Sequence, residues 1–203
     1  ETGPSNGYLE LVRKRCTEVG ALLILDEIQP GFGRTGTLFA FEHYNCVPDV
    51  LVIGKGMASG LPVGAFVSSQ TMMATLKDAP MLGHITTFGG NSVIAAAALA
   101  TLRELTRSSL IADTLQKEAL IRARLQHPSI LEIRGKGLML ALLMESSEIA
   151  NHLVHSCAEK GLILFWLLFE KRAVRITPPL TISIEEIEKG CDVILDVLNN
   201  MQQ

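Results

Sequence analysis

Several features that would define a class of protein are scarce or missing in this chain of 203 residues. Its four cysteines, Cys16, Cys46, Cys157 and Cys191, form no C-x-x-C pair, so they suggest neither a metal site nor a disulfide framework and fit a reducing cytoplasm. No apolar run reaches about 18 residues without a charge and no basic-then-apolar leader opens the chain, so neither a membrane span nor secretion is indicated. Like charges form no long block and the formal net charge is −3, which gives no reason to expect nucleic acid or an anionic membrane as partner.

The remaining composition is typical of a folded protein that binds small molecules. Hydrophobic residues make up 48% of the chain and charged residues 19%, which is enough to bury the core of one large domain or somewhat more. The opening residues, Glu1-Thr2-Gly3-Pro4, lack an initiator Met and run almost directly into a helix-like stretch. This start suggests a chain cut from something longer.

Helical and strand patterns alternate in the first half of the chain, which predicts an α/β fold. Short continuous apolar runs, typical of strands buried on both sides in a parallel sheet, occur at 21–25, 50–54 and 63–67. Helical periodicity or composition occurs at 8–19, 91–105 and 111–125.

The order of elements changes beyond His127-Pro128. Strands are expected at 130–144, broken by two glycines, and at 162–165 and 173–176, with helices at 148–160 and 184–198. This order is typical of a small α+β domain, and we place the two domains at 1–107 and 108–203. The most apolar stretch, 161–169, is interpreted as a buried strand and its exit.

The segment 31–36 has the G-x-G-x-x-G spacing of a dinucleotide-binding turn. Such a turn needs its first glycine at the end of a strand, a helix that opens at its last glycine, and an acid at the end of a following strand. Here residues 26–30 separate the apolar run from the glycines, residues 37–41 carry no helix start signal, and Asp49 precedes its strand rather than ending it. The dinucleotide interpretation is therefore disfavoured.

An acid and a lysine at two neighbouring strand ends are the stronger signal. Ligands of an open parallel sheet collect at the carboxyl ends of the strands, where Asp26 and Gln29 would project from the first run. The second run ends on the same edge at Gly54-Lys55-Gly56, whose bare flanks let backbone and ligand approach a nucleophilic amine. Alone, either residue has an ordinary interpretation, as a loop lysine or a helix-capping Asp. Together they are what pyridoxal phosphate requires, an amine that forms an imine and a carboxylate that keeps the pyridine nitrogen protonated.

With these residues in place, the segment ALLILDEIQPGFGRTGTLFAFEHYNCVPDVLVIGKGMASGLPVGAF resembles the central signature of the class III (subgroup II, ω-amino acid) aminotransferases of fold type I. The likeness continues through 86–91, 134–138 and 175–180 and covers essentially the whole chain. It implies that 1–107 are the C-terminal part of a large, mostly parallel-sheet domain that binds pyridoxal 5'-phosphate (PLP). It implies that 108–203 are a small C-terminal α+β domain.

The resemblance also implies roles for individual residues in cofactor binding. Lys55 matches the lysine that binds PLP covalently, Asp26 the partner of the pyridine nitrogen, and Gln29 the neighbour of the phenolic oxygen. Ile28 matches the residue that packs on one face of the ring, with a plain core residue as the alternative. Thr87 matches a threonine that reaches the cofactor phosphate of the other subunit, which implies a homodimer with shared active sites.

Two residues are implied in substrate binding. Arg175 matches the small-domain arginine that grips a substrate carboxylate through a bidentate fork, and Glu1 matches the glutamate that pairs with it in ornithine-type members. The implied reaction moves the ω-amine of an amino acid such as N-acetylornithine or ornithine to 2-oxoglutarate, with 4-aminobutyrate or another ω-amino acid as an alternative donor. The family's N-terminal half, with its phosphate-binding turn and ring-stacking aromatic, has no match here. An inactive fragment or dimer-forming remnant without a complete cofactor site therefore stays open.

Overall fold

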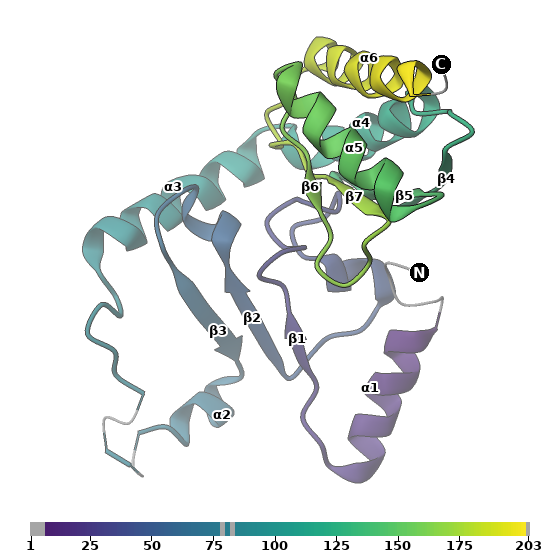
Figure 1. Ribbon diagram of the computed structural model, residues 1–203. Coiled ribbons are helices and arrows are strands. Elements are labelled where there is room, and N and C mark those ends of the chain that lie inside the picture. Colours follow the sequence, from purple (N-terminus) through teal and green to yellow (C-terminus); the bar gives the residue numbers. More distant parts are fainter. Residues whose placement is uncertain (1–6, 78–79, 82–83, 202–203) are drawn as a thin grey trace. The chain divides into compact units, whose positions relative to one another are not determined.

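The computed structural model describes residues 7–77, 80–81 and 84–201, and these form two compact units. The first unit contains the described residues up to Gly33 together with Thr37–Ser109, and the second contains Arg34–Gly36 and the described residues from Leu110 onward. Each unit has a sheet of its own, with strand order β1-β2-β3 in the first and β4-β5-β7-β6 in the second (Figure 1). The short piece Arg34–Gly36 thus belongs to a different unit from the residues on either side of it.

The sheet of the first unit contains one parallel and one antiparallel pairing. β1 (Ile24–Asp26) runs parallel to β2 (Val50–Gly54), and β2 runs antiparallel to β3 (Gly64–Ser68). The α-helices of this unit are α1 (Tyr8–Val19), α2 (Gln70–Ala74) and α3 (Ser92–Arg107), and the short 3-10 helices are η1 (Ala40–Tyr44) and η2 (Lys55–Ala58). Asn91 caps α3, because its side chain accepts hydrogen bonds from the amides of Val93 and Ile94.

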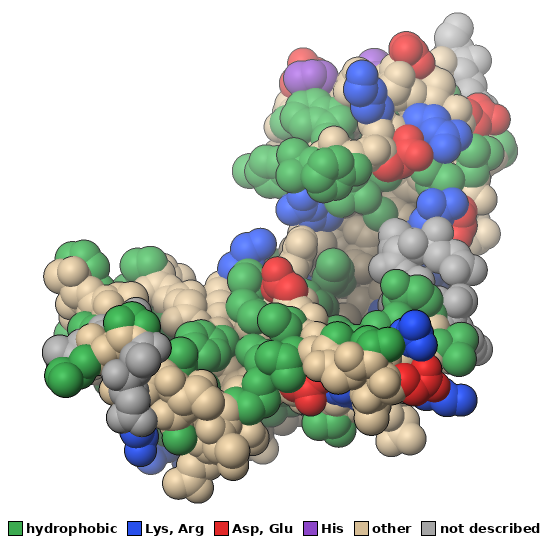
Figure 2. Space-filling view, turned by 90° about the horizontal axis from the view of Figure 1, so that it is seen from below, with side chains coloured by type: hydrophobic (Ala, Val, Ile, Leu, Met, Phe, Trp, Pro, Cys, Tyr) green, Lys and Arg blue, Asp and Glu red, His purple; other side chains and the backbone are tan. Residues whose placement is uncertain are grey.

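Strands β1 and β3 of the first unit are more exposed than their sequence predicts, whereas β2 is partly buried. Ile24 is 56% exposed, Phe66 50% and Val67 52%, although continuous apolar runs are typical of strands buried on both sides. Burial on both sides is therefore not seen for these residues in the described part of the chain, where helix α3 packs mainly against η2. On the face shown in Figure 2, apolar side chains are exposed and the Lys and Arg side chains are scattered among them.

The second unit is an antiparallel sheet with helices on one face. Its strands are β4 (Ile130–Lys136), β5 (Met139–Met144), β6 (Phe165–Trp166) and β7 (Ala173–Ile176), and its helices are α4 (Leu110–Arg124), α5 (Ser147–Glu159) and α6 (Ile184–Asn200). Alternate strand residues such as Leu140, Leu142 and Val174 join the helices in one buried core. A capping box between Ser183 and Glu186 starts α6.

The opposite face of this sheet carries the other alternate residues. Ala141, Leu143 and Ala173 form a small apolar cluster there, and Arg175 lies on the same face because it pairs with Ala141 of β5. Phe165 pairs with Arg175 from the other side. Arg175 therefore lies on β7 between an alanine and a phenylalanine, on the face that the core does not occupy.

The interpretation of 161–169 as a buried strand is wrong. Within this stretch only Phe165 and Trp166 are in a strand, and both are exposed. Leu168 is 84% exposed and Phe169 is 100% exposed. The apolar pattern predicted burial, but β6 is the edge strand of its sheet, and an edge strand has a neighbour on one side only.

None of the helices in the described part of the chain has both the length and the apolar composition needed to cross a bilayer. The described residues also contain no group of three or more His, Cys, Asp or Glu placed to hold a metal ion.

Candidate active site

The carboxyl ends of β1 and β2 meet at one edge of the first unit's sheet. β1 ends at Asp26, which lies opposite Val52, and β2 continues to Gly54, immediately before Lys55. The amide of Glu27 donates a hydrogen bond of 2.8 Å to the carbonyl oxygen of Val52, so the chain still lies against β2 one residue past Asp26. The structure thus brings Asp26 and Lys55 to the same edge of the sheet.

Lys55 lies on a tight turn between two glycines that have little room for a side chain. Its φ is +40°, a left-handed value that is uncommon for a residue other than glycine. A Cβ at Gly54 would lie 3.1 Å from the carbonyl oxygen of Val63, and one at Gly56 would lie 3.2 Å from Cβ of Phe32. The lysine side chain itself is exposed. Backbone strain of this kind, held in place by packing, is characteristic of functional sites.

Ile28 connects the ends of the two strands. Its amide donates a hydrogen bond of 2.9 Å to Oδ1 of Asp26, which folds the chain back beside the end of β1. Its side chain lies against Gly54, where an added Cβ would be 3.6 Å from Cγ2 of Ile28. Ile28 is partly buried, whereas the side chains of Asp26 and Gln29 are exposed. A carboxylate, an amine and an apolar surface therefore lie together at this edge.

Glu27, which no sequence pattern pointed to, has a structural role next to Asp26. It is only 3% exposed, and its carboxylate accepts hydrogen bonds of 3.0 and 2.8 Å from the amides of Ala40 and Phe41 at the start of η1. Burial raises the pKa of the Glu27 carboxyl, and the two amide hydrogen bonds partly oppose this shift. The start of η1 was missed at 37–41 because two of its amides are bound by a carboxylate that lies 13 residues before the first of them in the chain. Its local cap, Glu42, which accepts a hydrogen bond of 2.7 Å from the amide of Phe39, lies just beyond that range.

The first glycine of the G-x-G-x-x-G segment supports this turn instead of a phosphate. A Cβ at Gly31 would lie 2.6 Å from the carbonyl oxygen of Glu27, and the Gly31 amide donates a hydrogen bond of 3.0 Å to that oxygen. The close approach requires glycine at this position.

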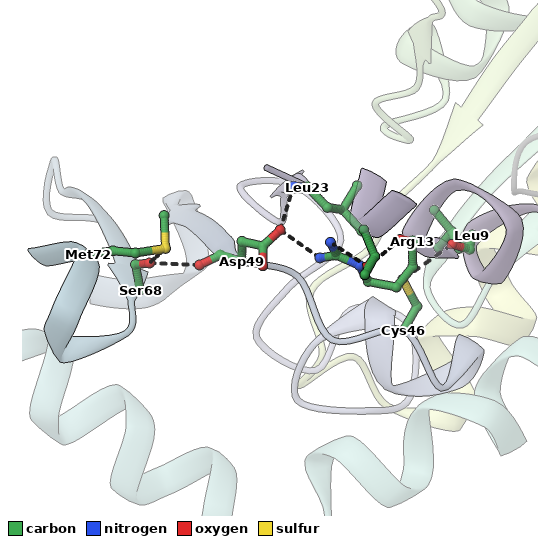
Figure 3. Close-up of polar contacts among 8 residues, drawn as sticks. Leu9, Arg13, Leu23, Cys46, Asp49, Ser68 and Met72 are labelled. Atoms are coloured by element: carbon green, nitrogen blue, oxygen red, sulfur yellow. Dashed lines mark hydrogen bonds and ion pairs between the residues drawn. The ribbon is translucent and has the colours of Figure 1, made fainter. Parts of the chain in front are cut away.

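Asp49, the acid that a dinucleotide site would need, is already engaged at the other end of β2 (Figure 3). Its Oδ2 accepts hydrogen bonds of 2.7 Å from the amide of Leu23 and 2.6 Å from Nη1 of Arg13. These two hydrogen bonds hold the pKa of Asp49 below its usual range, and the one from the Leu23 amide has the larger effect. Asp49 therefore ties α1 to the beginning of the strands.

Arg175, in the second unit, has an unsatisfied donor. The residue is partly buried, and its Nε is buried with no hydrogen-bond partner among the described residues. A buried donor without an acceptor is costly and is rare in folded proteins. The arginine is thus suited to receive an anionic oxygen from a ligand.

Two further predicted site residues lie elsewhere. Thr87 is exposed in the turn that precedes α3, where the amide of Gly89 donates a hydrogen bond of 3.2 Å to the carbonyl oxygen of Thr86. Glu1 lies outside the described residues, so its pairing with Arg175 stays a prediction.

Comparison with known proteins extends the resemblance over nearly the whole chain. A family model described as aminotransferase class-III matches residues 2–198. An ornithine aminotransferase from Toxoplasma gondii, crystallised with oxidised glutathione and showing partial occupancy of PLP at its active site, matches with a TM-score of 0.87 and 32% identity, over 98% of this chain and 49% of that one.

Two other solved structures match to a similar degree. One is the N-acetylornithine aminotransferase from Stenotrophomonas maltophilia K279a, with a TM-score of 0.84 and 29% identity over 98% of this chain and 52% of that one. The other is a thermostable (S)-enantioselective ω-transaminase from Thermomicrobium roseum, with a TM-score of 0.89 and 29% identity over 98% of this chain and 48% of that one. The chain spans about half the length of these structures. The likeness confirms the predicted α/β fold of the fold type I transferases.

Proposed function

Because the chain belongs to the class-III aminotransferase family, we propose that the protein transfers the ω-amine of an amino acid to a 2-oxo acid with PLP as its cofactor. Ornithine or N-acetylornithine is the proposed donor and 2-oxoglutarate the proposed acceptor. The observation that carries the proposal is the placement of Asp26 and Lys55 at the same carboxyl edge of β1 and β2.

The residues at this edge fit the chemical demands of the cofactor. The exposed amine of Lys55 would attach it covalently, Asp26 would face the pyridine nitrogen, and Gln29 would neighbour the phenolic oxygen. Ile28 offers an apolar surface for one face of the ring. When bound, PLP supplies an electron sink for bond breaking at the carbon that bears the amine.

Two side chains of this protein would control proton transfer and protonation in this reaction. Nζ of Lys55 would take the proton from the amine-bearing carbon as a general base and would then deliver a proton to a different carbon as a general acid. The carboxylate of Asp26, one oxygen of which is held by the Ile28 amide, favours the protonated pyridine nitrogen through its negative charge.

Arg175 is the proposed carboxylate-binding residue of the second unit. Its buried, unpartnered Nε supports this role, because a guanidinium and a carboxylate form paired, charge-assisted hydrogen bonds. Glu1 is proposed to mask Arg175 while the donor reacts through its distal amine. The acceptor's carboxylate would then displace Glu1 and bind to the arginine.

The oligomeric state, the domain division and the location of the protein are proposals as well. Thr87 is exposed in its turn, which suits a residue that serves the cofactor phosphate of a second subunit in a homodimer. The domains are proposed at 1–107 and 108–203. The four cysteines are free thiols, which fits the cytoplasm.

The proposed function is tested by a product assay on the full-length gene product. The purified protein is incubated with PLP, 2-oxoglutarate and one of three donors, ornithine, N-acetylornithine or 4-aminobutyrate, and glutamate is measured. We expect glutamate in proportion to protein, the highest kcat/KM with ornithine or N-acetylornithine, and none from Lys55→Ala. A higher kcat/KM with 4-aminobutyrate would select the alternative donor. Absence of glutamate with every donor would favour the inactive remnant.

A further inference from the structure

The segment Arg34-Thr35-Gly36 has no role in the proposed chemistry, yet it is packed into the unit that carries Arg175. Thr35 is only 6% exposed, and Arg34 is partly buried. The chain thus leaves the first unit after Gly33, docks three residues in the second unit, and returns at Thr37. A short docked piece of this kind needs specific contacts to hold it.

The contacts of Arg34 are with the backbone of two separate strand ends. Its Nη1 donates hydrogen bonds to the carbonyl oxygens of Pro178 and Leu138, the latter at 3.3 Å. The amide of Leu138 donates a hydrogen bond of 2.9 Å back to the carbonyl oxygen of Arg34. Burial lowers the pKa of Arg34, but a guanidinium still stays charged. Its hydrogen bonds to the two carbonyls are therefore charge-assisted.

These carbonyls belong to residues just outside β5 and β7, the two strands that pair at Arg175. Leu138 immediately precedes β5, and Pro178 follows the end of β7. Because β5 and β7 are antiparallel neighbours with Arg175 opposite Ala141, the start of β5 and the exit of β7 lie at the same end of the sheet. Arg34 thus ties together the two strand ends next to Arg175.

Glycines make this docking possible. A Cβ at Gly137 would lie 2.5 Å from the carbonyl oxygen of Arg34 and 2.7 Å from Cα of Thr35, and its φ is +62°. A Cβ at Gly36 would lie 2.7 Å from Cδ2 of Leu115. Gly137 therefore allows the close approach of its strand end to Arg34 and Thr35, and Gly36 allows the segment to approach Leu115 of α4.

Helix α4 holds the same two strand ends from its own side. Nζ of Lys117 donates a hydrogen bond of 2.6 Å to the carbonyl oxygen of Leu180, and Oε2 of Glu118 accepts one of 2.6 Å from the amide of Gly137. Each of these side chains holds one of the two segments. Among the described residues, Arg34 is the side chain that hydrogen-bonds to both Leu138 and Pro178.

We propose that Arg34 is a positioning residue for Arg175: by holding the carbonyls of Leu138 and Pro178 it fixes the exit of β7, and with it the direction in which Arg175 presents its donors to a substrate carboxylate. The inference rests on the proposed role of Arg175. A bidentate contact depends on placement, and a shift of about 1 Å can cost up to roughly a hundredfold in rate. Loss of Arg34 therefore weakens recognition of the 2-oxo acid and leaves the groups at Lys55 in place.

The test uses the PLP-loaded full-length gene product and follows the two half-reactions separately in single turnovers. Arg34→Met keeps much of the side-chain length without the charge, and Arg34→Lys keeps the charge. Arg124→Met is the matched control, because Arg124 forms a surface ion pair of 2.6 Å with Asp192 and, among the described residues, its side chain has no hydrogen bond to either strand end. We expect Arg34→Met to raise the apparent Kd for 2-oxoglutarate roughly tenfold to a hundredfold, the range for losing a charge-assisted hydrogen bond, with the donor half-reaction and the cofactor absorbance unchanged. Arg34→Lys should recover part of the loss, and Arg124→Met should match the wild type.

A double-mutant cycle separates positioning from general stability. In the Arg175→Met background, loss of Arg34 should add nothing to the Kd for 2-oxoglutarate, because Arg34 acts through Arg175. Equal losses in both half-reactions, or a further loss in the Arg175→Met background, would overturn the positioning role. Arg34→Lys is also measured alone and in the Arg175→Met background. If Arg34→Met folds poorly, the result for Arg34→Lys still decides the outcome. If Arg175→Met alone left the Kd unchanged, the proposed role of Arg175 would fail first, and this result does not depend on any Arg34 variant.

Discussion

Oδ1 of Asp26 accepts a hydrogen bond of 2.9 Å from the amide of Ile28. Among the described residues this is the hydrogen bond that fixes the Asp26 carboxylate, which otherwise stands exposed at the end of β1. An amide oxygen at the same position accepts the same bond, so charge and shape are separable at Asp26.

Asp26→Asn should keep the fold and lose most of the transaminase activity. The neutral amide retains the acceptor for the Ile28 amide but cannot favour a protonated pyridine nitrogen through charge. The cofactor should also bind more weakly. Turnover, cofactor titration by absorbance and the melting temperature measure the three effects. Near-normal turnover in this variant would refute the assignment.

Glu27→Ala should lower the free energy of unfolding because it leaves the partly buried amides of Ala40 and Phe41 without their acceptor. A buried polar group that loses its partner costs about 1–3 kcal/mol. Urea denaturation of wild type and variant measures the difference. An unchanged midpoint and slope would show that η1 does not depend on Glu27.

The contribution of Glu27 to stability should also depend on pH in a defined direction. Burial raises its folded-state pKa above the ordinary value of 4.5, so the folded state keeps the proton to a higher pH than the unfolded chain. The stability that Glu27 contributes is then complete below the ordinary pKa and is lost as pH rises through the raised one. The free energy of unfolding of wild type, minus that of Glu27→Gln, should fall as the pH rises from the ordinary pKa of 4.5 through the raised one. A rise over this range would contradict the raised pKa.

The elements that the sequence predicted well are those with strong local patterns. Expected ranges of 8–19 and 173–176 match α1 and β7, and the expected 50–54 matches β2. The predictions that failed concern the burial of strand residues and hydrogen-bond partners that lie far away in the sequence. Residues 161–169 have the most apolar pattern in the chain, but only the sheet order shows that β6 is an edge strand. Two amides at the start of η1 are bound by Glu27, which lies well before them in the sequence, so this part of the helix start was not visible.

The candidate site was predictable to a similar extent. Strand ends alone indicated that Asp26 and Lys55 share an edge, because β1 and β2 are parallel. The partners of Glu27 and Arg34 were not predictable, since both side chains bind backbone groups, which carry no sequence signature. The same holds for the close approach of Gly137 to Arg34.

Subunits that are inactive for different reasons should complement each other if the active sites are shared. Lys55→Ala lacks the proposed attachment point, and Thr87→Ala lacks the proposed donor to the neighbouring subunit's phosphate. A mixed dimer would hold one site with both lesions and one with neither, so activity should recover after subunit exchange. No recovery after demonstrated exchange would count against a shared site.

Arg175→Ala should mainly impair the half-reaction with 2-oxoglutarate, because the arginine is proposed to be masked by Glu1 while the donor reacts. Glu1→Ala should have the reverse effect and strengthen α-carboxylate substrates by roughly tenfold to a hundredfold, on the scale of about 1.4 kcal/mol for each factor of ten. Single-turnover spectra of the two half-reactions measure both variants. Equal losses in the two halves for Arg175→Ala would show that no such switch exists.

Reduction of the PLP-loaded full-length gene product with borohydride, followed by peptide mass spectrometry, tests the attachment of the cofactor to Lys55 most directly. Reduction fixes the cofactor to the amine that holds it. Lys55→Ala and Lys77→Ala serve as the matched pair, because Lys77 is a lysine of the same unit outside the strand ends. We predict that the reduced cofactor is recovered on the peptide containing Lys55, in wild type and in Lys77→Ala, and is lost in Lys55→Ala. Recovery on another lysine, or an active enzyme whose Lys55 stays unmodified, would contradict the proposed active site.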